Sequence, residues 1–588
     1  MKKILFFPLL FIAICLSASP IGERKARELA ESFFSSVGTR AVSQSVELEY
    51  VASAAGQEKV YVYNRAGGGF AVIAGDDRFS PVLAFSKEHT FDSDNMPPAA
   101  RHLLDCWAAQ IADGKVPAQA VESIGNEVLK YQTPLWSQSE PYNLEAPVID
   151  GQRCVTGCVA TAMAMILYHN RWPSKGTGTV PSYTYKYNGV NYKVPENSLG
   201  RTYDYNSMLM DYSYGYTSAQ GNAVAAIMKD LGTSVNMAYG PGASSSTSQL
   251  IPAAMSTYFS YSKASQCVSA GLYDDKEWVE AIQENIRNCG PTIVSGQSPE
   301  GGHAFIADGY TDRGYISFNF GWGGYSNGYY LVPSIEYNQY QDAVFGLVPD
   351  YNGTTAYADR LCLILLMDGN GETVFGGLYP DPLTPVEIKP GAKFMLRVGG
   401  IINRGQVSFN GTWKLSVCDP EGKIIMDLCG ENSLRNLQPS YYTYTSYSLA
   451  LPDQFVEGYR IRLLYKGENS AEWQWARAEG EGVTDEIILC PSAEELSKSL
   501  SLKYDKERKT LSIVSAYAID WSFFEMTAGH GVFCTDAWKE HALDLKAAAD
   551  EAIAVDVSFA LQPGVSAEES GELSKGPMVG FSSTLDYN

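Results

Sequence analysis

A ten-residue run without a charged side chain, Cys158–Leu167, constrains the fold of this 588-residue chain more than any other stretch. The run follows Gly157 and consists of small and apolar residues, which predicts a helix that is buried from its first turn. A thiol at a helix N-terminus meets unpaired backbone N–H groups and the positive end of the helix dipole, and both lower its pKa. Cys158 is therefore a candidate nucleophile, although free cysteines more often serve as small buried packing residues.

The N-terminus, residues 1–19, has the pattern of a bacterial signal peptide. Lys2 and Lys3 precede an apolar segment, Ile4–Leu16, that is too short to span a bilayer comfortably. Ile14 precedes Cys15, whereas a lipid-modified cysteine normally follows a small residue, which argues against lipid anchoring. We therefore expect a secreted or cell-surface protein without an integral membrane segment.

The rest of the chain predicts several domains, because single hydrophobic cores stop growing at roughly 250–300 residues. Residues 20–131 predict a compact α+β unit that ends in a linker at about 114–132. Residues 132–350 place helices early and strands late, which is typical of a two-lobed α+β domain with a cleft. Short apolar strands and turns then predict two β-sandwich-like modules, residues 351–490 and 491–588.

Charge and cysteine spacing limit the partners and cofactors. The formal charge of −22 argues against nucleic acid as a partner. The eleven cysteines form no CxxC pair or zinc-like spacing, so we expect neither a metal nor another cofactor. Disulfides are compatible with secretion, but the spacings specify no pairing, and a nucleophilic Cys158 must stay free.

A nucleophilic cysteine needs a base, which is most often histidine. His169 lies eleven residues along the same predicted helix as Cys158, about 16 Å away at 1.5 Å per residue, which excludes direct contact. His303 lies in one predicted strand and Asn319 in the next. A hairpin centred on Thr311 would place these two residues directly opposite each other, so that the Asn319 amide oxygen could accept a ring N–H. An ordinary polar cross-strand pair is the alternative.

Two further side chains belong to this hypothesis. Gln152 supplies an amide donor six residues ahead of Cys158, and with the Cys158 backbone N–H it could form an oxyanion hole. A solvated loop residue is the alternative for Gln152. Asp308 could also orient His303, but strand parity predicts that it lies on the opposite face and caps the turn.

With these residues assembled, the chain resembles the streptopain family of papain-like cysteine peptidases. The resemblance covers about residues 132–348 and rests on these motifs: Gln152–Ala162, Gly302–Ile306 and Asn319–Gly324, with support from Glu140–Asn143 and Tyr239–Ala243. Interpain-like members of this family share the order of signal, propeptide, catalytic domain and additional C-terminal domains.

The resemblance implies a secreted endopeptidase made as a zymogen, with a thioester intermediate and the preceding α+β unit as an inhibitory propeptide. Cys158 would be the nucleophile, His303 the base and acid, and Asn319 the orienting residue. Gln152 would be the oxyanion donor, and Trp322 would belong to an aromatic cover over the His–Asn pair. The implied partners are protein and peptide substrates and the chain's own propeptide, which would be cut off within 114–132.

The resemblance also implies a set of substrate-binding residues: Gly240, Gly242, Ala243, Ser244, Ser245 and Gly302. The loop that carries most of them would favour an apolar residue at the second position before the cut. Phe320 departs from the family pattern, which has a tryptophan directly after the asparagine. We expect Phe320 still to supply apolar cover, and we expect Cys154 to be dispensable for catalysis.

Two other functions remain open from the residues alone. The same Cys–His chemistry would serve a cell-wall peptide amidase or endopeptidase. A non-catalytic surface-binding protein would use the C-terminal β modules, for which the sequence offers no defined binding constellation.

Overall fold

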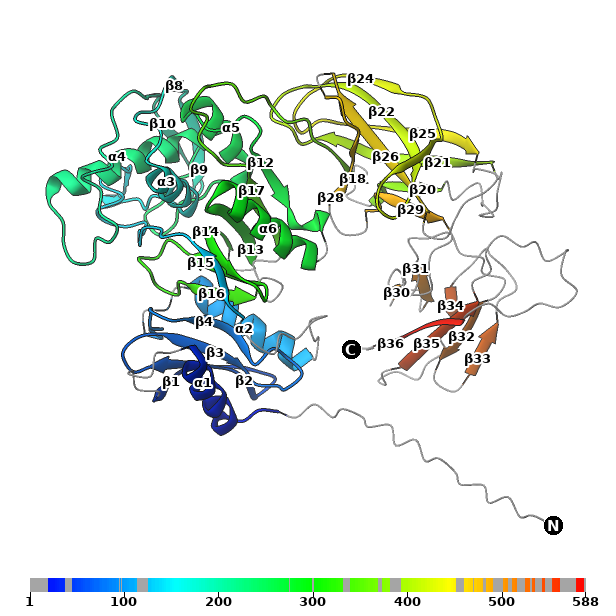
Figure 1. Ribbon diagram of the computed structural model, residues 1–588, viewed down its shortest axis with the longest axis horizontal. Coiled ribbons are helices and arrows are strands. Elements are labelled where there is room, and N and C mark those ends of the chain that lie inside the picture. Colours follow the sequence, from blue (N-terminus) through cyan, green and yellow to red (C-terminus); the bar gives the residue numbers. More distant parts are fainter. Residues whose placement is uncertain are drawn as a thin grey trace, which may run out of the picture. The chain divides into compact units, whose positions relative to one another are not determined.

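The computed structural model describes residues 20–37, 45–94, 96, 98–113, 125–273, 275–298, 301–331, 339–367, 373–380, 393–450, 459–468, 470–479 and 483–489, and the strand backbones between 501 and 585. The predicted signal peptide, most of the predicted linker and the predicted module boundary at 490–491 lie outside the described residues. The chain divides into two compact units, Met1–Ala356 and Tyr357–Asn588 (Figure 1).

The first unit begins with two helices and an antiparallel meander of four strands. These elements are α1 (Glu23–Val37), β1 (Val46–Ala54), β2 (Gln57–Arg65), β3 (Phe70–Ala74), β4 (Val82–Ser86) and α2 (Pro98–Asp113). Ala26, Ala30 and Phe34 of α1 are fully buried in the core that includes β2 and β3. Their spacing of about one helical turn explains the predicted amphipathic helix.

The meander continues into the sheet of the next domain, so that the described residues form one 11-stranded sheet. Ten of its strands follow the order β1-β2-β3-β4-β16-β15-β14-β13-β17-β12, and the eleventh pairs with β14 beside this path. The added strands are β12 (Gln266–Ser269), β13 (Thr292–Ser298), β14 (Gly301–Thr311), β15 (Tyr315–Asn319), β16 (Gly328–Leu331) and β17 (Gln339–Phe345). At the junction of β4 with β16, Phe85 pairs with Tyr329 and Ala84 with Tyr330. The two predicted domains therefore share a sheet.

The predicted linker contains one further strand, β5 (Glu127–Lys130), which pairs with β14. A Cβ atom at Gly309 would lie 2.6 Å from the Leu129 carbonyl oxygen, so only glycine lets β5 approach this closely. The prediction of an unpatterned linker was wrong for this segment. β5 is short, and none of its residues is fully buried, so it carries no alternation that would reveal a strand.

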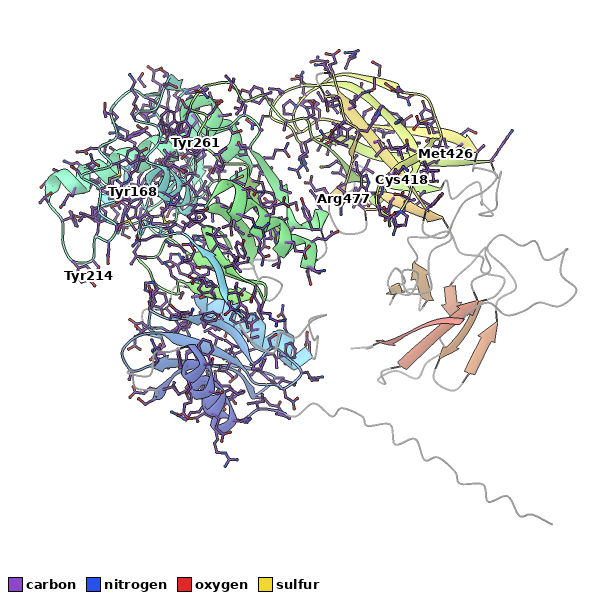
Figure 2. All side chains as sticks on the ribbon, in the orientation of Figure 1. Tyr168, Tyr214, Tyr261, Cys418, Met426 and Arg477 are labelled. Atoms are coloured by element: carbon purple, nitrogen blue, oxygen red, sulfur yellow. The ribbon has the colours of Figure 1, made fainter. Side chains whose placement is uncertain are left out.

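Six helices follow β5 in the described part of the chain. They are α3 (Cys158–Asn170), α4 (Ser218–Ser234), η1 (Ser248–Leu250), α5 (Ile251–Tyr258), η2 (Ala270–Leu272) and α6 (Asp275–Cys289). Three of them, α3, α4 and α5, contribute to a second core. Short strands accompany them: β6 (Val148–Ile149), β7 (Gln152–Arg153), β8 (Thr179–Val180), β9 (Tyr183–Tyr187), β10 (Val190–Val194) and β11 (Asn197–Ser198). α3 is buried from Val159 to Tyr168, which confirms the predicted buried helix. Tyr168 and Tyr261 lie in this interior, whereas Tyr214 is exposed (Figure 2).

The second unit is built from strands throughout its described part. One sheet contains β18 (Leu361–Met367), β19 (Thr373–Gly376), β20 (Leu378–Pro380), β21 (Lys393–Asn403), β25 (Tyr442–Ala450) and β28 (Ala478–Glu479). Another contains β22 (Phe409–Cys418), β23 (Ile424–Asp427), β24 (Asn432–Leu437), β26 (Tyr459–Gly467), β27 (Gln474–Trp475) and β29 (Glu486–Leu489). Leu363 and Leu396 of the first sheet share a core with Leu415 and Leu463 of the second.

Two smaller sheets follow. The first contains β30 (Ser501–Asp505), β31 (Thr510–Val514) and β34 (Ala542–Asp544). The second contains β32 (Phe524–Ala528), β33 (Gly531–Cys534), β35 (Ile553–Ala560) and β36 (Met578–Leu585). Within the described part of the chain, no helix has the length and apolar character needed to cross a membrane.

Candidate active site

Cys158 is the first residue of α3, and Gly157 precedes it with φ 87°. A Cβ atom at Gly157 would lie 2.6 Å from the sulfur of Met237, so both conformation and space require glycine ahead of the thiol. Burial raises the pKa of the Cys158 thiol above its ordinary value, although the nearby backbone of Ala304, Val159 and Cys158 acts in the opposite direction. The thiol is therefore protonated at neutral pH.

His303 lies on β14, which packs against α3, and is 8% exposed. Its Nε2 lies 2.9 Å from the carbonyl oxygen of Phe320. A carbonyl only accepts, so Nε2 carries a proton and Nδ1 is the proton-accepting nitrogen of the neutral ring. Burial lowers the pKa of His303 to about 4, although the Phe320 carbonyl acts in the opposite direction. The imidazole is therefore neutral at neutral pH.

The predicted pairing of His303 with Asn319 is wrong. Asn319 lies opposite Ile306, because the hairpin is centred on Arg313 rather than Thr311 and the register shifts between Ala307 and Gly309. Asp308 is the extra residue at that shift. The error comes from the centre of the hairpin: counting back from Thr311 gives His303 as the partner of Asn319, whereas counting back from Arg313 gives Ala307, which the bulge changes to Ile306.

Asn319 directs its hydrogen bonds elsewhere. Its Nδ2 donates to Thr133 Oγ1 at 3.1 Å and to the Pro134 carbonyl at 2.9 Å, and its Oδ1 accepts from the Gly321 amide at 3.1 Å. The Phe320 carbonyl thus takes the place beside His303 that the sequence assigned to the Asn319 side chain.

Asp308 does not cap the turn, contrary to the prediction. Its carboxylate is fully buried, accepts a hydrogen bond from Thr133 Oγ1 at 2.5 Å and forms an ion pair with Lys130. Neither Lys130 nor Thr133 was singled out from the sequence. Both lie in or next to a segment that resembled a linker, and only the fold brings them to β14.

Trp322 and Phe320 cover the histidine. The Trp322 ring stacks on His303 with centroids 4.8 Å apart, and Phe320 stacks on Trp322 at 4.9 Å. Phe320 therefore contributes apolar surface to this cover, as expected of an aromatic residue in the position of the family's tryptophan.

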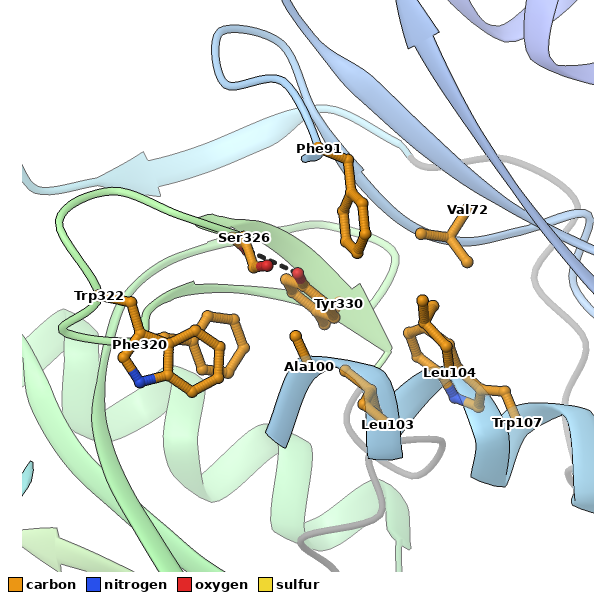
Figure 3. Close-up of a pocket in the computed structure, with 10 residues that line it drawn as sticks. All are labelled: Val72, Phe91, Ala100, Leu103, Leu104, Trp107, Phe320, Trp322, Ser326 and Tyr330. Atoms are coloured by element: carbon orange, nitrogen blue, oxygen red, sulfur yellow. Dashed lines mark hydrogen bonds between the residues drawn. The ribbon is translucent and has the colours of Figure 1, made fainter. Parts of the chain in front are cut away.

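The N-terminal α+β unit packs on this aromatic cover, as Figure 3 shows. A cavity of only about 10 Å³ is left between the two sides. Its lining residues come from the N-terminal unit (Val72, Phe91, Ala100, Leu103, Leu104 and Trp107) and from the segment that carries the cover (Phe320, Trp322, Ser326 and Tyr330). Such a cavity holds at most about one water molecule, so the two surfaces are closely packed. The residues that the N-terminal unit contributes to this contact were not foreseen from the sequence.

The remaining predicted site residues lie in three places: β7, the loop after Tyr239 and the start of β14. Gln152 belongs to β7, pairs with Ile149 and is exposed. In the loop after Tyr239, Ser244 is buried and its Oγ donates to the Val155 carbonyl at 2.7 Å. Ser244 therefore fastens the loop to the segment before Cys158. The other predicted substrate-binding residues divide into the buried Gly240 and the exposed Gly242, Ala243, Ser245 and Gly302.

Cys154 is fully buried, and its backbone carbonyl accepts a hydrogen bond from Asn143 Nδ2 at 3.0 Å. Its amide donates to the Pro147 carbonyl at 2.9 Å. Asn143, from one of the supporting motifs, thus anchors the segment that leads to Cys158. Both Cys154 and Cys158 are free thiols.

A thiol begins a buried helix, and a covered histidine lies on the sheet against which this helix packs. A family model described as the peptidase C10 family matches residues 136–330, and one described as the Spi protease inhibitor matches residues 18–111. Streptopain of Streptococcus pyogenes serotype M1 is 30% identical over 323 residues, which cover 49% of this chain and 81% of streptopain. The chain belongs to the peptidase C10 family and is a cysteine-type endopeptidase with a propeptide.

Two further relatives have related descriptions. The thiol protease/hemagglutinin PrtT of Porphyromonas gingivalis is 30% identical over 393 residues, which cover 60% of this chain and 45% of PrtT. A solved structure of prointerpain A from Prevotella intermedia is 29% identical. It covers 52% of this chain and 99% of the solved chain, with a TM-score of 0.44.

Proposed function

We propose that Cys158 is the nucleophile of this endopeptidase and that His303 is its base and acid. The proton of the thiol passes to Nδ1 of His303, and the thiolate attacks a substrate peptide carbonyl. The tetrahedral intermediate then collapses, the C–N bond breaks, and His303 returns the proton to the leaving amine. His303 next activates the water that hydrolyses the thioester. The observation that carries the proposal is that α3, which begins with Cys158, packs against β14, which carries the covered histidine.

Gln152 and the loop after Tyr239 bind the substrate. Gln152 lies before Cys158 on an exposed strand, where its amide and the Cys158 backbone N–H serve as oxyanion donors. The exposed Gly242 and Ala243 contact the chain of the substrate, whereas Ser244 holds their loop in place. The residue at the second position before the cut is apolar.

The precursor is secreted through a signal peptide at residues 1–19 and inhibited by its own propeptide. The catalytic domain has two lobes with the cleft between them, and it includes β5, so that the maturation cut falls upstream of Glu127. Residues 361–489 form a β-sandwich, supported by the common core of its two sheets. The strands between 501 and 585 form a second β-sandwich-like module.

The test compares two substrates of the activated, propeptide-free enzyme. We expect casein to be cleaved at internal bonds and peptidoglycan peptides to remain intact, as mass spectrometry of the products would show. Consumption of the peptidoglycan peptides with casein untouched would instead identify a cell-wall peptide amidase or endopeptidase. Failure to cleave either substrate, together with no alkylation of Cys158 by iodoacetamide, would favour a binding protein.

A further inference from the structure

We propose that Asp308 and Thr133 are positioning residues for His303. They act through Asn319 and the Phe320–Gly321 peptide, without touching the histidine themselves. The inference rests on the proposed role of His303 as the base, and it adds to the site two residues that lie far from Cys158 in the sequence.

The first observation is a buried chain of hydrogen bonds. Asp308, Thr133 and Asn319 are 0%, 7% and 1% exposed. Asp308, which pairs with Lys130, is the acceptor at the end of this chain. A carboxylate only accepts, so the Thr133 hydroxyl must donate to Asp308, and the Thr133 oxygen is left to accept from Asn319 Nδ2. One charge thus sets the direction of both hydrogen bonds.

The second observation is the consequence for the Asn319 amide. With Nδ2 held by Thr133 and by the Pro134 carbonyl, Oδ1 is turned toward the Gly321 amide, which donates to it at 3.1 Å. A trans peptide bond directs its N–H and C=O groups to opposite sides. Holding the Gly321 N–H toward Asn319 therefore aims the Phe320 carbonyl away from Asn319. That carbonyl lies 2.9 Å from His303 Nε2.

The third observation concerns the peptide before this one. The Phe320 amide donates to Asn327 Oδ1 at 3.0 Å, so Phe320 is held on its N-terminal side as well. A fixed carbonyl keeps the proton on Nε2 and leaves Nδ1 to receive the thiol proton. Lys130 lies near the end of the predicted linker and Thr133 directly after it, so the segment at the start of the mature enzyme is part of its active-site support.

The decisive variant is Thr133→Val, which keeps the shape of the side chain and removes the hydroxyl. We expect kcat of the mature enzyme on a peptide substrate to fall about 10- to 100-fold, with KM changed by less than about twofold. The apparent pKa for alkylation of Cys158 by iodoacetamide should shift as well, because the histidine partner is misaligned. Thr133→Ser restores the hydroxyl and should recover most of kcat.

The matched control is Thr292→Val on β13 of the same sheet. Thr292 is buried as well, and its Oγ1 also accepts from an asparagine amide, that of Asn285. Both valine variants should lose similar thermal stability, whereas only Thr133→Val should lose kcat. If Thr133→Val does not fold, the isosteric Asp308→Asn should also lower kcat, because an asparagine side chain can donate as well as accept and no longer forces the Thr133 hydroxyl to be the donor.

Equal activities of Thr133→Val and Thr292→Val would overturn the inference, as would a Thr133→Ser enzyme no better than Thr133→Val. Failure of the proposed function would be recognised separately, because the unmodified enzyme would then leave casein intact. An unmodified enzyme that cleaves casein beside an equally active Thr133→Val variant refutes only the positioning role.

Discussion

Replacing His303 by glutamine is expected to lower kcat of the mature enzyme by at least about 10³-fold, with KM changed only a few-fold. Glutamine can still donate to the Phe320 carbonyl and pack under Trp322, but it cannot take a proton from the Cys158 thiol. The reaction would lose its base and its acid while the binding surface stays in place. Steady-state kinetics on a fluorogenic peptide would measure both constants.

His169→Gln is the matched control. His169 lies in the last turn of α3, where its ring packs against Tyr131, and we expect this variant to keep most of the activity. Equal losses in both histidine variants would contradict the assignment of His303.

The pH dependence of precursor stability provides a second readout for His303. Its pKa is lowered to about 4 in the folded precursor, so between pH 6.5 and 4 the unfolded chain binds the proton that the folded chain excludes. The stability that His303 contributes is fully present above pH 6.5 and is lost as the pH falls toward 4. The His303→Gln precursor should lack this part of the acid destabilisation, and melting curves across that range would detect the difference.

Phe85→Ala is expected to destabilise the precursor by about 3–5 kcal/mol and to speed its activation. Phe85 is fully buried where the propeptide strands meet β16. Its ring stacks on that of Tyr329 with centroids 5.0 Å apart, and it meets the edge of Tyr315 with centroids 5.6 Å apart. Truncation of the Phe85 side chain would leave a cavity at the junction of β4 and β16, which holds the propeptide on the catalytic domain. Thermal unfolding of the precursor and the rate at which casein-cleaving activity appears would measure the two effects.

The chain supplies its own control for this variant. Residue 85 is removed with the propeptide, so mature enzyme from the Phe85→Ala precursor should have the same kcat and KM as the unmodified enzyme. A Phe85→Ala precursor with unchanged melting temperature and activation rate would show that the junction of β4 and β16 does not hold the propeptide in place.

The parts of the fold and site that the sequence predicted have strong local signals. The run from Cys158 to Leu167 is apolar all round, which only a buried helix accommodates. His303 was found by elimination, because His169 is too far along the helix and the other four histidines lie outside the catalytic domain. Trp322 was placed over the histidine by resemblance to the family, and the structure has it there.

The parts that were missed depend on contacts between distant segments. The turn signals placed the centre of the hairpin at Thr311, whereas it lies at Arg313, and this error put Asn319 opposite His303. The bulge at Asp308 changes the register by only one residue, from Ala307 to Ile306. β5 has no buried face, and its pairing with β14 joins residues about 180 positions apart. The pairing of Phe85 with Tyr329 is likewise invisible in either segment alone.

Mass spectrometry of the purified precursor beside its Cys158→Ala and Cys154→Ser variants tests the central claim most directly. Cys154 is buried and not assigned to the chemistry, so its variant controls for the loss of a neighbouring thiol. The unmodified chain and Cys154→Ser should both yield a mature N-terminus upstream of Glu127, while Cys158→Ala should retain its propeptide. Release of the propeptide from Cys158→Ala at the normal rate and at the same position would contradict the assignment of Cys158 as the nucleophile.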